Sequence, residues 1–170
     1  MISIPIYFIT NRALASEEKY FEVIKNVAGY NNIKIILREK DLNDEEYKKL
    51  YYKVKELAPN TEIIINSKLK VFNEVNEKTI QLSFNDFMAL GEVDYNVGVS
   101  VHNVEEGKLA YSKGAKYILA SHIFETKCKE GLISGQAKDN TIKELKRKYK
   151  EVFTIKFRGS LSEWEYRTPL

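Results

Sequence analysis

A chain of 170 residues, of which 44% are hydrophobic and 30% charged, is long enough to bury the core of one globular domain. Its formal net charge of +3 is slight and its lysines alternate with acids on helical stretches, so we expect a solvated surface and no nucleic-acid-binding face. No apolar stretch is long enough to cross a bilayer, and a single cysteine, which excludes an internal disulfide, is typical of the reducing cytoplasm.

The first third of the chain predicts two strands separated by a helix. Residues 3–10 form an apolar run that we interpret as a strand and not as a signal peptide, because it has no basic leader and no small-residue cleavage site. Ser16 is the expected N-cap of a helix with the apolar stripe Tyr20, Ile24 and Val27. A turn at residues 29–32 leads to a second strand at residues 33–37.

The middle of the chain repeats this alternation. Asn43 and Glu46 form a capping box that predicts the start of a helix, and Pro59 marks its end. The apolar face of this helix consists of Tyr47, Leu50, Tyr51, Val54 and Leu57. Strands are predicted at residues 63–65 and 79–82, with a weak helix at residues 70–75 and a short helix at residues 86–90.

Residues 97–120 form the most distinct strand–helix–strand unit. The β-branched run at residues 97–101 predicts a buried strand, and Asn103 with Glu106 forms a second capping box. Leu109 and Ala110 are expected to face inward, and Gly114 stands where a left-handed helix end is needed. Residues 117–120 follow as a strand, which we expect to be parallel to the first because the connection contains a helix.

The last part of the chain predicts a helix at residues 141–149, a seventh strand at residues 152–157 and an irregular tail at residues 158–170. No Pro/Gly-rich linker or change of composition divides the chain, so we interpret residues 1–170 as a single domain. The alternation of strands and helices predicts an all-parallel α/β fold. Periodicity does not distinguish an open sheet from a barrel. No G-x-G-x-x-G follows the first strand, so the main sign of a dinucleotide-binding sheet is missing.

The carboxyl ends of the predicted strands carry a series of polar motifs. They are Leu37-Arg38-Glu39-Lys40-Asp41, Ile64-Ile65-Asn66, Gln81-Leu82-Ser83, Gly98-Val99-Ser100-Val101-His102 and H-I-F-E-T-K-C-K-E-G-L from residue 122. Together they resemble the thiamin phosphate synthase and TenI superfamily, over the chain up to its seventh strand. The resemblance implies a parallel (βα) barrel of the TIM type.

Within this superfamily, the departures favour the TenI branch. Ile36 stands where the synthase pattern has a glutamine, and Ser67 where it has an aspartate that serves magnesium. Residues 81–83 replace a His-Leu-Gly, although Asp86 stands at a second metal-ligand position, and Ser121-His122 replaces a Gly-Pro. The resemblance to TenI implies a thiazole tautomerase of thiamin biosynthesis, which aromatises a thiazole carboxylate phosphate by proton transfer without metal or redox cofactor.

His122 is the predicted catalytic residue. It follows a parallel strand directly, where α/β proteins bind ligands, and imidazole gives and takes protons near neutral pH. The alternative is a hydrogen-bonded histidine without chemistry. We expect His102, which precedes a helix cap, to be structural.

Arg38 and Lys40 are predicted to clamp a phosphate or carboxylate, because arginine binds such groups through two parallel hydrogen bonds. The alternative is a salt-bridged loop in a neighbourhood rich in acids. Asn66 and Ser100 are expected either to bind the substrate or to cap their own loops. The family pattern and the residues Thr126, Lys129, Gly131 and Gly135 together predict a phosphate-binding loop.

Two other functions stay open. A thiamin phosphate synthase would join a pyrimidine pyrophosphate to a thiazole phosphate and would require Mg²⁺, with Asp86 as a ligand. A non-catalytic homologue would bind a phosphorylated ligand as a regulator, although no helix-turn-helix or basic stripe predicts DNA contact.

The end of the chain departs from the family pattern, which has Gly-Gly and an eighth strand where this chain continues as Phe157-Arg158-Gly159-Ser160. A complete barrel takes at least about 200 residues. We therefore expect a barrel incomplete at its C-terminus, with about seven strands and an impaired phosphate site. A homodimer or a covering by residues 161–170 is expected to protect the open edges.

Overall fold

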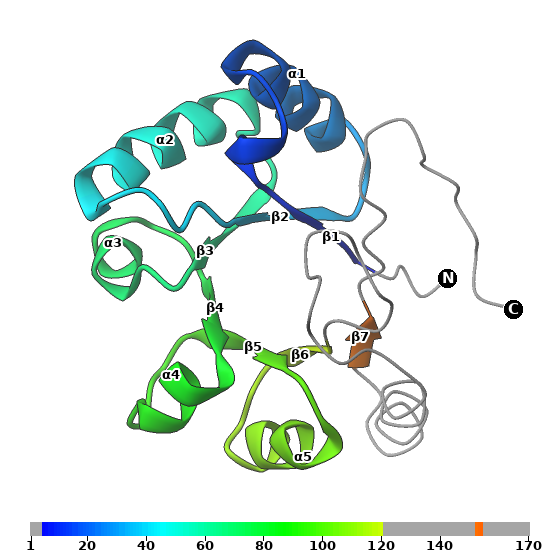
Figure 1. Ribbon diagram of the computed structural model, residues 1–170, viewed down its shortest axis with the longest axis vertical. Helices are drawn as coiled ribbons and strands as arrows, with labels where there is room; N and C mark the ends of the chain where they lie inside the picture. The colour runs from blue at the N-terminus through cyan, green and yellow to red at the C-terminus, as the bar shows by residue number, and fades with distance from the viewer. Residues whose placement is uncertain (1–4, 121–151, 155–170) are drawn as a thin grey trace, which may run out of the picture. The chain divides into compact units, whose positions relative to one another are not determined.

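The computed structural model of the chain describes residues 5–120 together with the backbone of residues 152–154. The chain forms two compact units, residues 1–98 and 99–170. Among the described residues, strands and helices alternate in chain order and every registered strand pair is parallel (Figure 1). This confirms the predicted parallel (βα) architecture. The described part contains seven strands, and the predicted helix at residues 141–149 and the tail at residues 158–170 lie outside it.

The first unit contains four neighbouring strands. They are β1 (Ile6–Ile9), β2 (Ile33–Leu37), β3 (Glu62–Asn66) and β4 (Thr79–Ser83), paired in that order. Ile36 is the register partner of Ile9 on one side and of Ile64 on the other. Runs of isoleucine suit these positions, because β-branched side chains favour strands and a parallel strand is covered on both faces.

The helices of this unit are η1 (Arg12–Leu14), α1 (Glu17–Ala28), α2 (Asp44–Leu57), α3 (Leu69–Glu74) and α4 (Phe84–Ala89). Figure 1 shows α1, α2 and α3 on the same side of the strands. The predicted capping box of Asn43 and Glu46 is present at the start of α2. Within the described residues, no helix combines the length and the apolar character needed to cross a membrane.

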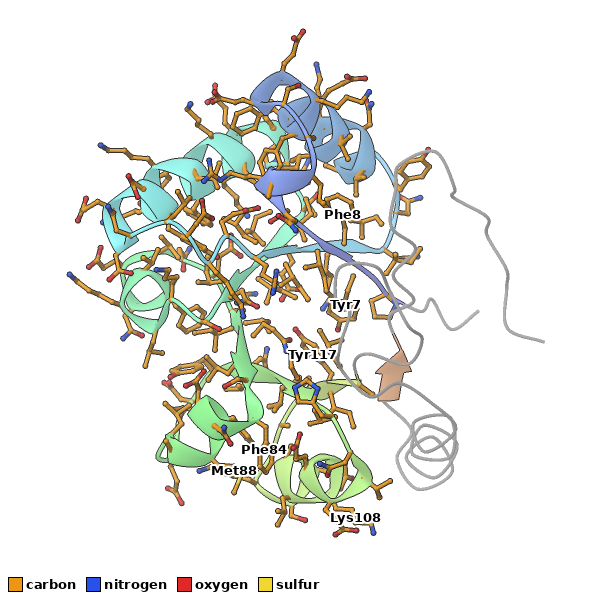
Figure 2. The ribbon with its side chains drawn as sticks, viewed as in Figure 1. Tyr7, Phe8, Phe84, Met88, Lys108 and Tyr117 are labelled. Carbon is orange, nitrogen blue, oxygen red and sulfur yellow. The ribbon has the colours of Figure 1, made fainter. Side chains whose placement is uncertain are left out.

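Both faces of β2 and β3 are buried and apolar in the middle of the strands. Ile35, Leu37, Ile63 and Ile65 are fully buried on one face, and Ile36 and Ile64, on the opposite face, are buried as well. On β1, Tyr7 and Phe8 lie on opposite sides of the strand (Figure 2). The register places Tyr7, Lys34 and Glu62 in one row at the amino ends of β1, β2 and β3.

The second unit contains α5 (Val104–Ser112), β6 (Tyr117–Ala120) and β7 (Val152–Thr154), while β5 (Asn96–Val101) begins in the first unit and ends in the second. β6 and β7 are parallel, with Ile118 opposite Val152. Asn103 caps α5 by accepting a hydrogen bond from the Glu106 N–H, as predicted. Gly114 has the expected positive φ of 94°, a conformation that glycine adopts without strain.

Two expectations about single elements are wrong. α4 begins at Phe84 and not at residue 86, because the Ser83 hydroxyl accepts a hydrogen bond from the Asp86 N–H and acts as the N-cap. Leu109 was expected to face inward, but it is 51% exposed, and the inward positions of α5 are Gly107 and Ala110.

Candidate functional site

Three polar side chains form a row at the carboxyl ends of β2, β3 and β4. Asn66 and Gln81 are register partners, and continuing the β2–β3 register by one residue beyond Leu37 and Ile65 places Arg38 beside Asn66. Neighbouring strands lie about 4.8 Å apart, so the three side chains share one face at close spacing. Active sites of parallel (βα) barrels lie at this end of the strands. The row of Arg38, Asn66 and Gln81 is therefore the candidate site of the first unit.

Arg38 is half-buried at the first position after β2, and its backbone N–H donates to the Thr10 hydroxyl over 2.9 Å. Within residues 5–120, its guanidinium makes neither an ion pair nor a side-chain hydrogen bond, and the same holds for the exposed Lys40. The predicted alternative of a salt-bridged loop does not apply to these two cations in this part of the chain. Neither cation is therefore occupied by an acid of residues 5–120.

The acids beside them bind Arg12, a residue that the sequence did not single out. Arg12 Nη2 lies 2.6 Å from Asp41 Oδ2, and its Nε lies 3.8 Å from Glu39 Oε2. The Arg12 backbone N–H also donates to Glu39 Oε2 over 2.9 Å. Arg12 follows β1, so it neutralises the acidic loop of the neighbouring strand and leaves Arg38 and Lys40 outside this network.

Glu39 itself is a buried structural group, with 3% of its surface exposed. Its Oε1 accepts hydrogen bonds from the Thr10 hydroxyl at 2.6 Å and the Tyr20 hydroxyl at 3.0 Å. Burial raises the pKa of Tyr20 above the ordinary tyrosine value, and the Glu39 charge adds to this effect, so the hydroxyl stays protonated as a donor. Glu39 thus joins the ends of β1 and β2 to α1.

Asn66 and Ser67 form a constrained step at the end of β3. Ser67 has a φ of 60°, an uncommon left-handed conformation for a residue other than glycine. Its backbone N–H donates to the Gln81 carbonyl over 2.9 Å, and its hydroxyl oxygen lies 3.0 Å from Asn66 Nδ2. Because Nδ2 is directed at Ser67, the amide oxygen of Asn66 is the group that this side chain offers as a ligand acceptor.

Asp86 lies near the end of β4, in the first turn of α4. Its exposed carboxylate accepts a hydrogen bond of 2.6 Å from the Ser83 hydroxyl. No three His, Cys, Asp or Glu side chains gather into a metal site in the described part of the chain. Asp86 therefore offers a single carboxylate and is not part of an acidic cluster among the described residues.

The remaining predicted residues belong to the second unit. Ser100 is half-buried on β5, and the His102 backbone N–H donates to Glu106 Oε2 over 2.8 Å, which agrees with a role at the start of α5. The other predicted site residues, His122, Thr126, Lys129, Gly131 and Gly135, lie outside the described residues.

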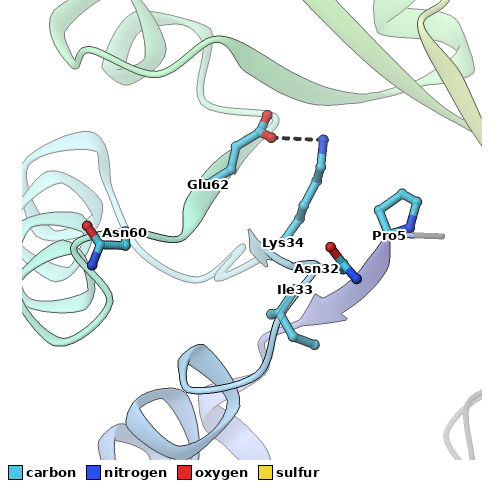
Figure 3. A pocket seen from close by; sticks show the side chains of 6 residues that line it. All are labelled: Pro5, Asn32, Ile33, Lys34, Asn60 and Glu62. Carbon is cyan, nitrogen blue, oxygen red and sulfur yellow. Dashed lines mark ion pairs between the residues drawn. The ribbon is translucent and has the colours of Figure 1, made fainter. Parts of the chain in front are cut away.

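Two cavities of the first unit lie away from the candidate row. One of about 250 Å³ is at the amino ends of the strands and is lined by Pro5, Asn32, Ile33, Lys34, Asn60 and Glu62 (Figure 3). Lys34 Nζ lies 2.8 Å from Glu62 Oε2 there. The other, of about 370 Å³, is lined by residues of α1 and α2 and includes Arg12. The amino ends of barrel strands serve stability and not catalysis, so we do not place the active site in the first cavity.

Comparison with known proteins identifies similar sequences and a similar fold. A family described as thiamine monophosphate synthase (TMP-TENI) matches residues 6–155. The thiamine-phosphate synthase of Fusobacterium nucleatum is 28% identical over 134 residues, which are 74% of this chain and 64% of the relative. That of Caldanaerobacter subterraneus is 30% identical over 132 residues, or 72% of this chain and 61% of the relative. The chain thus spans less than two thirds of the length of these two relatives.

Among solved structures, the thiamine phosphate pyrophosphorylase of Pyrococcus furiosus aligns with 89% of this chain and 74% of its own, with a TM-score of 0.66 and 20% identity. A likeness at this identity concerns the fold alone, and it agrees with the parallel (βα) architecture described above.

Proposed function

The chain belongs to the thiamine monophosphate synthase family, and on this premise we propose that it acts as a thiamine-phosphate synthase. The reaction would join a pyrimidine carried on pyrophosphate to a thiazole phosphate and release pyrophosphate. The predicted TenI-type tautomerase is wrong, because the relatives similar to this chain are named thiamine-phosphate synthase. That prediction rested on Ile36, Ser67, residues 81–83 and Ser121-His122, which depart from the synthase pattern.

The observation that carries the proposal is the pairing of two features at the carboxyl ends of β2 and β3. Arg38 makes no ion pair within residues 5–120, and Asn66 is its expected neighbour in register. A guanidinium binds phosphate oxygens through parallel hydrogen bonds, and a neighbouring amide adds orientation. Lys40 contributes a further positive charge from the same loop.

The residues of this site fit magnesium only if the substrate's pyrophosphate supplies part of its ligands. Mg²⁺ usually keeps several waters and binds through one or two carboxylates together with substrate phosphates. Asp86 supplies one carboxylate and Asn66 an amide oxygen, whereas Ser67 supplies a hydroxyl that already contacts the Asn66 amide. Asp86 would therefore hold the ion together with the pyrophosphate of the substrate. The bound ion would offset the negative charge of that group.

The test is pyrophosphate release by the purified chain when both substrates and Mg²⁺ are supplied. Release that requires both substrates supports the proposal, and its absence, together with no binding of pyrophosphate in calorimetric titration, contradicts it.

A second candidate is a non-catalytic protein that binds the same phosphorylated ligands. Ser67 favours it, because a hydroxyl is a weaker magnesium ligand than the aspartate of the synthase pattern. Binding of pyrophosphate without turnover would support this candidate. For either candidate, the single cysteine supports a cytoplasmic location, and a homodimer stays a prediction.

A further inference from the structure

The hydroxyl of Tyr47 lies between the carboxyl ends of β2 and β3. Tyr47 is a fully buried residue of α2. Its hydroxyl donates to the Leu37 carbonyl on β2 and accepts a hydrogen bond of 3.1 Å from the Asn66 N–H on β3. A side chain from the helix layer therefore connects the backbones of the two strands that carry Arg38 and Asn66.

This hydroxyl lies at the last pairing of β2 with β3. The Ile36 carbonyl accepts from the backbone N–H of Thr10, which follows β1, and carbonyls along a strand point alternately to its two neighbours, so the Leu37 carbonyl points to β3. Its partner in the ladder is the Asn66 N–H, because Leu37 is paired with Ile65. Tyr47 is hydrogen-bonded to both of these backbone groups.

The hydroxyl bridges the strand ends at the candidate site, because it bonds one backbone group of each strand. Arg38 immediately follows Leu37, and Asn66 itself donates the second bond. The hydroxyl of Tyr47 consequently determines how far apart these two site residues stand.

The protonation state of Tyr47 suits this role. Burial raises the pKa of its hydroxyl above the ordinary tyrosine value and outweighs the lowering by the Asn66 hydrogen bond, and the charge of Glu39 adds a further small increase. The hydroxyl therefore keeps its proton at neutral pH and can donate and accept at the same time.

We propose that Tyr47 is a positioning residue whose hydroxyl sets the spacing of Arg38 and Asn66 for a phosphate-bearing ligand. The inference rests on the proposed function for the identity of the ligand and on the two hydrogen bonds for the spacing. Tyr47 does not touch the ligand, and it acts through the backbone of the two strands.

The test compares Tyr47→Phe with Tyr51→Phe in the full chain. Tyr51 is a matched control, because it is a buried tyrosine of the same helix, 3% exposed, whose hydroxyl donates to Glu77 Oε1 over 2.9 Å. Each variant loses one buried hydroxyl, so both are expected to show a similar decrease in melting temperature. Only Tyr47→Phe changes the ends of β2 and β3.

Calorimetric titration with pyrophosphate is the first measurement, made at a temperature where circular dichroism shows all proteins folded. A displacement of about 1 Å can cost up to roughly a hundredfold, so we expect at least about tenfold weaker binding for Tyr47→Phe and less than about twofold for Tyr51→Phe. In turnover assays, KM should rise more than kcat falls. Equal binding by the two variants would overturn the proposal.

Amide hydrogen exchange at Asn66 is the second measurement, and it needs no ligand. Tyr47→Phe should change the protection of this amide relative to wild type, whereas Tyr51→Phe should not. Unchanged protection overturns the spacing role whatever the titration shows. Failure of the wild type to bind pyrophosphate contradicts the proposed function and the ligand part of this inference, while the exchange result still decides the spacing.

Discussion

Arg12 Nη2 lies 2.6 Å from Asp41 Oδ2, which couples the segment after β1 to the loop after β2. Glu39 of the same loop also faces Arg12, so the acids of this loop have a cation from the neighbouring strand. Arg38 and Lys40 stand beside these acids in sequence but form no ion pair with them. The cation that pairs and the cation proposed to bind ligand are therefore different residues.

Replacing Arg38 should weaken the binding of pyrophosphate. Hydrogen bonds to a charged group contribute about 1.5–3 kcal/mol, so Arg38→Ala should raise the Kd by roughly ten- to a hundredfold. Arg38→Lys keeps the charge but not the planar fork, and an intermediate Kd is expected. Calorimetric titration measures both variants.

Lys25→Ala is the control, because Lys25 is exposed in the last turn of α1 and its replacement removes the same unit of charge. It should leave the Kd unchanged apart from a small general effect of charge. An Arg38→Ala variant that binds as well as Lys25→Ala would show that the row at the strand ends is not the ligand site.

Replacing Glu39 should destabilise the fold. The amide nitrogen in Glu39→Gln would face groups that donate to the carboxylate, and an unsatisfied buried polar group costs about 1–3 kcal/mol in free energy of unfolding. Urea denaturation measures this loss. Asp41→Asn, at a side chain 67% exposed, should change the free energy of unfolding by no more than about 0.5 kcal/mol. Equal effects of the two substitutions would mean that Glu39 does not join α1 to the strands.

Replacing Asp86 should weaken the effect of magnesium on ligand binding. Asp86→Asn keeps an oxygen that accepts from the Ser83 hydroxyl but removes the negative charge that Mg²⁺ prefers. In titrations with pyrophosphate, the increase in affinity on adding Mg²⁺ should be smaller than in wild type. Ser83→Ala is the control, because it loses about 1 kcal/mol of helix capping and retains the carboxylate. The same magnesium effect in Asp86→Asn as in wild type would remove Asp86 from the proposed site.

The lowered pKa of Glu62 predicts that the stability of the protein depends on pH. Burial alone would raise its pKa, but hydrogen bonds from Lys34 and Thr79 and the nearby lysine charges outweigh burial and lower the pKa below the ordinary value of 4.5. A carboxylate with a lowered folded-state pKa stabilises the protein above its unfolded-state pKa, and this contribution is lost as pH falls through the folded-state value. Glu62→Gln should therefore be less stable than wild type near about pH 7, and the difference should shrink as pH falls below 4.5.

Thermal unfolding over a pH series measures this difference. Glu22→Gln is the control, because Glu22 forms an exposed pair with Lys19 on α1 and its side chain is 53% exposed. A constant difference between wild type and Glu62→Gln down to acid pH would contradict the assigned role of the Lys34–Glu62 pair.

Local signals in the sequence were sufficient for most elements of the fold. The Asn43–Glu46 capping box and the turn glycine Gly114 act within a few residues, so their effects can be predicted without the tertiary structure. The start of α4 was missed because Ser83 was treated as a strand residue and its capping hydroxyl was not considered. Leu109 was misplaced because α5 presents Gly107 and Ala110 to the interior, and small residues give little signal in an apolar pattern.

The candidate site was predictable only in part. Arg38 follows β2 and Asn66 is the last residue of β3, and that position alone makes them candidate site residues. The roles of Arg12 and Tyr47 depend on groups 27 and 19 residues away, in Arg12–Glu39 and Tyr47–Asn66. Such contacts are fixed by strand register and by the packing of α2, which no short stretch of sequence reveals.

The ion pair between Lys34 and Glu62 favours one register of β2 against β3 over the others. These two residues are opposite each other, and Thr79 of β4 also donates to Glu62 over 2.5 Å. If β2 slipped by one residue, Lys34 would move to the face that carries Ile35 and Ile63, which are fully buried. It would leave Glu62 behind and bury an unpaired ammonium among isoleucines. Strands as uniform as Ile-Lys-Ile-Ile-Leu and Glu-Ile-Ile-Ile-Asn would otherwise fit several alignments almost equally well, and one ion pair at their amino ends makes the wrong alignments unfavourable.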